Sequence, residues 1–402
     1  MTLALQEIRA RPGQHILLAL VLTLLVTASL GMISLYRGIV VDATAVINLA
    51  KPDLWVVERG TIGPFAERSI LDASVADGVA GVPGIARTRR YLQVVRELQL
   101  DETRRRTSII GIDPRSDYGN WLPIADGRAP RDRGDVAVDR SLGMVLGQTL
   151  TIDNQRYLVV GTMNGFVDTE GDPILVSGIA DARLLAKPVI AAVSRQRVKT
   201  TVESLDSTPY GRQLSDSAEQ SAVVRTTLFS APEVPISAVM VDVSQTARNA
   251  DVARSIELRQ DVSVLTQSEQ IDSIVNHRMY KLRIQIMIFC IFILIITGII
   301  TGLIVYARVL ENRSIIALLL YMGAPEKNIA GYVIFTALIL AMEAYVLASV
   351  TGFFLFKIFP RQTVLLPLDR FVVGTAVLGI SLISSLYAVR VALRTSPREA
   401  LE

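Results

Sequence analysis

Four long apolar stretches interrupt an otherwise polar sequence. Each is apolar over at least about 19 residues, close to the roughly 20 that a helix needs to cross a bilayer. They cover residues 16–36, 284–307, 329–356 and 371–389. The pattern predicts four transmembrane helices with about 240 polar residues between the first two. It excludes a fully soluble protein and equally one buried throughout in the membrane.

The first apolar stretch has two interpretations. Small residues at Ala28–Gly31 would suit cleavage of a signal peptide. The apolar run continues to Tyr36, longer than a signal-peptide core, and this favours an uncleaved anchor. Four crossings place both ends of the chain on one side, with residues 37–283 and the 357–370 loop on the other. Lys and Arg flank the helices equally, about eight on each side, so charge bias leaves the orientation open.

One carboxylate, Glu343, falls near the middle of the third predicted helix. An isolated charge at that depth costs several kcal/mol unless it is paired or protonated. Thr336 lies two helical turns before Glu343 on the same face, and Ser349 offers a second hydroxyl. We therefore favour a polar contact between helices through such a hydroxyl. A contact with a proton or a substrate is the alternative.

The polar region between residues 41 and 276 alternates strand-like and helix-like segments. Its two ends, residues 49–112 and 233–267, contain strands with intervening helices and predict one α+β layer with the helices on one face. Residues 113–232 carry short β-branched strands separated by turn signals, typical of a smaller β-rich lobe inserted into the first. A helix over 268–283 is expected to continue unbroken into the second transmembrane helix as a rigid stalk.

Composition and motifs offer little chemistry. The net charge is +3 from 41 basic and 38 acidic residues, without the basic patch of a nucleic-acid-binding protein. The single cysteine, Cys290, lies in an apolar stretch, so the polar region has no disulfide within the chain. No phosphate-binding G-x-x-x-x-G-K-[ST], no G-x-S-x-G and no metal-ligand spacing occurs. Asp168, Glu170 and Asp172 read as a solvated turn. We expect no catalytic residue, cofactor or metal in this chain.

The segment between the second and third predicted helices, residues 308–328, is expected to form a short helix at the bilayer surface. Gly323 suits a left-handed cap and Pro325 the first turn of the next helix. The segment resembles the permeases of the MacB/FtsX-type ABC transporter family, also called type VII. The matching positions are Glu311, Arg313, Ala317, Leu318, Leu319, Gly323 and Ala324. The chain departs from the family at Ile315, where Glu is usual, and at Leu320, which is often basic.

Other segments resemble the same family. Residues 4–12 look like the short amphipathic helix that precedes the first crossing, and residues 392–401 look like the closing motif. Within the family, Pro52–Val57 and Ile110–Pro114 look most like the DevC-like branch.

The resemblance implies an α+β protein of the bacterial inner membrane. Residues 1–15, 308–328 and 390–402 would be cytoplasmic, and residues 37–283 periplasmic. The periplasmic domain would combine a ferredoxin-like porter lobe (49–112 and 233–267) with the inserted β-rich lobe. In this family the segment at 308–328, including Pro325, couples the permease to its ATPase.

The resemblance also implies partners. We expect a homodimer of this chain with two copies of a separate ATPase subunit, which binds ATP and Mg²⁺. DevC-like members work with a HlyD-type adaptor and a TolC-like outer-membrane duct, and are associated with export of lipid-like compounds. We also expect contacts with membrane lipids, and none with nucleic acid. In the dimer, a cleft between first and second helices would be lined by Leu24, Met32, Phe289 and Phe292.

Two other functions stay open. An FtsX-like mechanotransmitter would use the same machinery to regulate an extracytoplasmic partner. FtsX-like domains are small, so about 240 residues with an inserted lobe favour transport. The second alternative is a membrane-anchored receptor without an ATPase, for which no ATPase subunit would bind the short helix.

Overall fold

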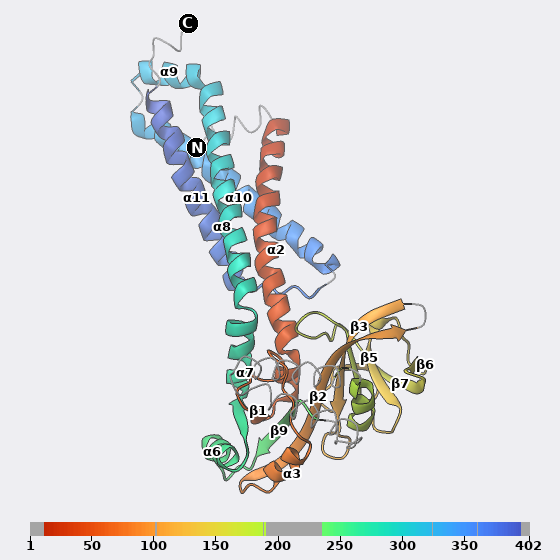
Figure 1. The fold of residues 1–402 in the computed structure, drawn as a ribbon. Coiled ribbons are helices and arrows are strands. Elements are labelled where there is room, and N and C mark those ends of the chain that lie inside the picture. Colours follow the sequence, from red (N-terminus) through yellow and green to blue (C-terminus); the bar gives the residue numbers. More distant parts are fainter. Residues whose placement is uncertain are drawn as a thin grey trace, which may run out of the picture. The chain divides into compact units, whose positions relative to one another are not determined.

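A computed structural model describes residues 12–100, 103–187, 189, 235–323, 325–359 and 361–394. The chain divides into two compact units (Figure 1). The helical unit comprises Met1–Ile39 and Tyr280–Glu402, and the sheet unit comprises Val40–Met279. The predicted amphipathic segment at 4–12 and the closing motif at 392–401 lie largely outside the described residues.

All four predicted membrane spans are helices long and apolar enough to cross a bilayer. They are α2 (Pro12–Ala50), α8 (Tyr280–Glu311), α10 (Glu326–Ile358) and α11 (Pro367–Arg394). The first ends 14 residues beyond the expected end at residue 36, because no proline interrupts the chain between Pro12 and Pro52. Lys51 takes a left-handed conformation (φ 42°) and ends α2.

Small residues bring the helices of the helical unit together. Alanines and a glycine on one face of α10 are buried, at Ala337, Ala341, Ala344, Ala348 and Gly352. Small side chains let backbones approach closely in apolar surroundings. On α8, Gly298 packs against α11, where Ser384 Oγ donates a hydrogen bond of 2.7 Å to the Gly298 carbonyl.

One mixed sheet organises the sheet unit. Within the described residues its order is β10-β1-β9-β2-β3-β8-β5-β7-β4, with β6 paired to β7. The strands are β1 (Leu54–Glu58), β2 (Ile85–Leu100), β3 (Thr103–Ile112), β4 (Ile124–Gly127), β5 (Asp135–Asp139), β6 (Thr149–Ile152), β7 (Gln155–Met163), β8 (Ile174–Gly178), β9 (Ala238–Val243) and β10 (Val262–Thr266).

The first four strands of this order confirm the ferredoxin-like lobe. Strands β10, β1, β9 and β2 are antiparallel neighbours. Helix α3 (Ser74–Ala80) follows β1 and α6 (Asn249–Arg259) follows β9, as a β-α-β-β-α-β chain requires. The inserted strands join the same sheet through a parallel pairing of β3 with β8, register Ile110 to Val176. The two predicted lobes are therefore parts of one sheet.

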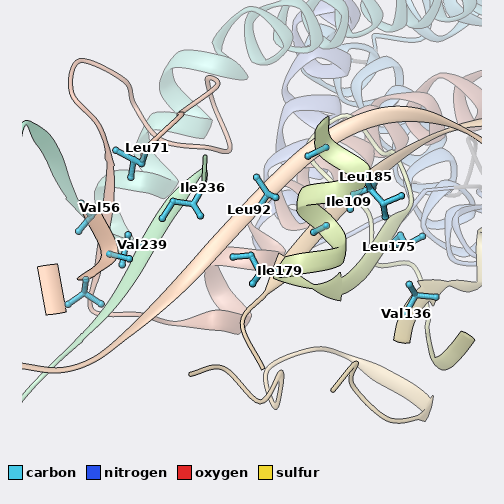
Figure 2. Close-up of a cluster of buried hydrophobic side chains, with 14 of the residues drawn as sticks. Val56, Leu71, Leu92, Ile109, Val136, Leu175, Ile179, Leu185, Ile236 and Val239 are labelled. Atoms are coloured by element: carbon cyan, nitrogen blue, oxygen red, sulfur yellow. The ribbon is translucent and has the colours of Figure 1, made fainter. Parts of the chain in front are cut away.

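An apolar core runs along this sheet (Figure 2). Leu92 of β2 and Ile109 of β3 belong to it, together with Ile179 and Leu185 from the short helix at 179–187. Gly111 of β3 is needed for this packing, because a Cβ there would press on Ala182 of the helix. At the ferredoxin-like end, Trp55 packs edge-on against Phe65 and Tyr91.

The stalk is not the unbroken helix that the sequence predicted. Helix α7 (Gln267–Ser273) begins in a capping box between Thr266 and Glu269. It changes to a π-helical turn over Ile274–Arg278, which we call the π-turn. Met279 then leaves helical geometry, and α8 begins at Tyr280. Such π-turns are rare and frequently mark functional positions.

Candidate functional site

The short helix predicted between the second and third spans is present as α9 (Arg313–Tyr321), and Gly323 is left-handed as expected (φ 83°). One face of α9 is buried: Ile316 packs into a cluster with α8, α10 and α11, and Ala317 beside it is also buried. The opposite face presents apolar side chains at Ile315, Leu318 and Tyr321, with Leu318 57% exposed. We call these three residues the α9 surface.

The residues predicted to contact an ATPase therefore separate into two groups. Glu311, Arg313, Leu318, Gly323 and Pro325 are exposed, whereas Ala317 is buried in its own helical unit and stabilises α9. Ala324 lies outside the described residues. Ile315 and Tyr321 are not among the positions that match the family motif. Each lies three residues from Leu318, so the three side chains share one helical face.

A polar network links three helices of the helical unit. His15 Nε2 of α2 lies 2.6 Å from Glu343 Oε2 of α10, and Arg308 Nη2 of α8 lies 2.8 Å from His15 Nδ1. A guanidinium can only donate, so Nδ1 accepts and Nε2–H donates to the carboxylate. The imidazole of His15 thus bridges the Arg308 guanidinium and the Glu343 carboxylate.

The hydroxyl partners predicted for Glu343 are wrong. Thr336 Oγ1 donates to the Tyr332 carbonyl and Ser349 Oγ to the Tyr345 carbonyl, each at 2.9 Å on their own helix. The contact between helices that we expected is made instead with His15, which is 328 residues away in sequence.

The loop before α11 holds α2 further along the helical unit. Arg37 Nη2 donates to Asp369 Oδ1 at 2.7 Å, and Val364 N donates to the Ser34 carbonyl at 3.1 Å. Gly38 permits this approach, because a Cβ there would overlap the Gln362 carbonyl.

The predicted cleft residues lie on α2 and α8. Leu24, Phe289 and Phe292 point out of the single chain, whereas Met32 is partly buried. Lipid or a second copy could cover these side chains, and the cleft stays a prediction.

The end of α2 is held inside the sheet unit by Arg89 of β2, which we call the α2 anchor. Arg89 Nη2 donates to the Ala50 carbonyl at 3.1 Å and to Asp242 Oδ1 at 3.0 Å, and Nη1 lies 3.5 Å from Asp117 Oδ2. Arg89 and Asp117 are each only 4% exposed. Asp117 also accepts from Trp121 Nε1 at 2.9 Å, so the end of α2 is tied to β2, β9 and the β3–β4 loop.

The end of the π-turn is held differently, by Arg278, which we call the π-turn anchor. Arg278 Nη1 donates to the Ala66 carbonyl at 2.8 Å, and its Nη2 pairs with Glu170 in the β7–β8 loop. Arg106 of β3 donates to the same carboxylate at 2.5 Å, and its Nε lies 2.9 Å from Asp172 Oδ2 as an ion pair. The Arg278 and Glu170 side chains are 34% and 42% exposed, so solvent weakens this pair.

No group of three or more His, Cys, Asp or Glu among the described residues could hold a metal ion.

Comparison with known families identifies the family of this chain. Residues 16–258 match the MacB-like periplasmic core domain, and residues 287–397 match the FtsX-like permease C-terminal region. The chain belongs to the MacB/FtsX family of ABC transporter permeases. It is thus a multi-pass inner-membrane protein whose sheet unit is periplasmic, and an ABC permease implies an ATPase partner.

Curated relatives agree over the full length. Uncharacterized ABC transporter permeases of Mycobacterium bovis and Mycobacterium tuberculosis are each 23% identical over 98% of this chain and 97% of the relative. Among solved structures, the periplasmic region of MacB from Actinobacillus actinomycetemcomitans aligns at 12% identity and TM-score 0.34, covering 56% of this chain and 93% of that one. The extracellular domain of the noncanonic ABC-type transporter YknZ from Gram-positive bacteria aligns at 12% identity and TM-score 0.32, covering 53% and 98%.

Proposed function

We propose that this permease converts ATP hydrolysis on a separate subunit into movement of its periplasmic sheet unit. The observation that carries the proposal is α8, a single helix of 32 residues between α9 and the π-turn. At 1.5 Å per residue it is about 48 Å long, more than the roughly 30 Å of a bilayer core. Such a helix transmits a displacement at one end to the other.

The two anchors give the movement a direction. The buried α2 anchor fixes the end of α2 to strands β2 and β9, so α2 acts as the pivot. The π-turn anchor is exposed and follows a segment that is not regular α-helix. The attachment of α8 to the sheet unit is therefore the weaker of the two, and α8 acts as the lever.

The α9 surface is the proposed ATPase contact. The three side chains form an exposed apolar stripe on α9, opposite its buried face. The cores of protein–protein interfaces are likewise poor in charged residues. We propose two ATPase copies bound to a homodimer of this chain, with ATP and Mg²⁺ held by the ATPase subunits.

We further propose export of a lipid-like or amphiphilic substrate, through a HlyD-type adaptor and a TolC-like duct. The support for this part is the resemblance of Pro52–Val57 and Ile110–Pro114 to the DevC-like branch. If the movement instead switches a periplasmic partner, the coupling would be the same and only its output would differ.

The test is ATPase activity of the chain co-purified in lipid with the ATPase encoded beside it. Leu318→Asp places a charge in the centre of the α9 surface, and we expect the ATPase to be lost from the complex. The control is Leu258→Asp, the same change at an exposed leucine of α6 in the sheet unit. A wild-type complex that never forms, or one that both variants keep intact, would contradict the proposal.

A further inference from the structure

A cavity of about 180 Å³ lies in the sheet unit beside the π-turn anchor. Its apolar lining comes from Leu92 and Val94 of β2, from Ile236, which forms a bridge with Leu71, and from Ile70. A dry cavity of about 150 Å³ holds a benzene molecule, so this one has room for an apolar arm of about six to eight atoms.

Three arginines line the same cavity, namely Arg68, Arg106 and Arg278. Arg106 and Arg278 converge on one carboxylate, that of Glu170. No carboxylate pairs with Arg68 among the described residues. Glu67 and Asp168 also line the cavity, and Asp168 Oδ1 already accepts the Glu170 and Asp172 amides at 2.9 Å each.

Glu170 is the exchangeable member of this cluster. Its side chain is 42% exposed and projects from a turn, and exposed ion pairs contribute only about 0–1 kcal/mol. A ligand carboxylate or phosphate can take its place between two guanidiniums at little cost, because the donors are already assembled.

We propose that this cavity binds an anionic amphiphile, or the end of a larger one. The ligand's carboxylate or phosphate replaces Glu170 on Arg106 and Arg278, and its apolar arm lies against Leu92 and Val94. Binding releases Arg278 from the β7–β8 loop while leaving its bond to the Ala66 carbonyl. The effect on transport rests on the proposed function, since it makes ligand occupancy loosen the attachment of the lever to the β7–β8 loop. The binding itself does not rest on it.

The test uses the full chain in nanodiscs without any ATPase, so failure of coupling cannot affect it. Hexanoate and hexyl phosphate are the probes, with hexanol as the neutral probe of equal length, and binding is measured by calorimetry. Arg278→Gln should weaken anion binding about tenfold or more, since it removes a charged hydrogen-bond donor. Glu170→Gln should tighten it up to about fivefold, because the internal competitor is gone. Arg140→Gln is the matched control, because Arg140 pairs with Asp126 and does not line the cavity.

The two anions separate the two head-group chemistries. Tighter binding of either anion in Glu170→Gln, with hexanol unaffected by both variants, supports the site. Equal binding of hexanol and the anions, or unchanged anion binding in Arg278→Gln, overturns it. Amide hydrogen exchange gives a second readout: residues 168–173 should exchange faster with the anion bound, and unchanged exchange would contradict the release of Arg278.

Discussion

The α2 anchor and the π-turn anchor should differ sharply in what they contribute to stability. Arg89→Gln removes one partner of a buried ion pair, which typically costs 3–5 kcal/mol. Asp117 keeps its bonds from Gly119 N and Trp121 Nε1, and Asp242 keeps Arg87, so the loss falls at the lower end, about 3 kcal/mol. Arg278→Gln removes an exposed pair and should cost about 1 kcal/mol.

The chain provides its own probe for this experiment. Its two tryptophans, Trp55 and Trp121, both lie in the sheet unit, so intrinsic fluorescence reports the unfolding of that unit alone. For a unit of this size, 1 kcal/mol corresponds to a shift of about 2–4 °C in Tm. We therefore expect a fall of about 6–12 °C for Arg89→Gln and about 2–4 °C for Arg278→Gln.

The matched control is Arg87→Gln. Arg87 pairs with the same Asp242, but its side chain is half exposed, so its loss should resemble that of Arg278. If Arg89→Gln shifts Tm no more than Arg87→Gln does, Arg89 is not a fixed anchor. The assignment of α2 as the pivot would then be wrong.

Two further predictions concern single contacts. Burial, with a smaller contribution from the charge of Asp168, holds the pKa of the Tyr91 phenol well above its usual value. The folded state keeps a proton that the unfolded chain releases near pH 10, so the sheet unit loses stability as pH rises above about 10. Tyr91→Phe should reduce this slope in unfolding measured by circular dichroism between pH 9 and 11, and an unchanged slope would refute the assignment. In the helical unit, Glu343→Leu should destabilise by about 1–3 kcal/mol, because His15 loses its acceptor. Glu343→Gln can still accept from His15 and should lose less in thermal unfolding; equal losses in the two variants would argue against the His15 contact.

Local patterns predicted most of the architecture. The four spans and the short helix before Gly323 follow from hydropathy and caps, although α2 runs 14 residues past its predicted end. Alternation predicted the α+β layer, and the family resemblance added its ferredoxin-like form. The resemblance of residues 308–328 then predicted a coupling segment there, and exposure along α9 separates the buried Ala317 from the exposed Leu318.

The contacts that matter mechanically could not be predicted in this way. His15 and Glu343 are 328 residues apart, and the partners of Arg89 are Ala50, Asp117 and Asp242, so no local spacing signals them. The π-turn was not predicted either, because residues 268–282 are ordinary helix formers. Only tertiary bonds, such as those of Arg278 to Ala66 and Glu170, accompany the change in helical pitch there.

The most direct test of the lever is amide hydrogen exchange on the complete complex, with and without ATP, using a hydrolysis-deficient ATPase to hold the ATP-bound state. The account predicts that exchange in residues 274–279 changes when ATP binds, while residues 40–50 at the α2 anchor stay equally protected. An ATP-bound complex with no change at 274–279, or with an equal change at 40–50, would contradict it.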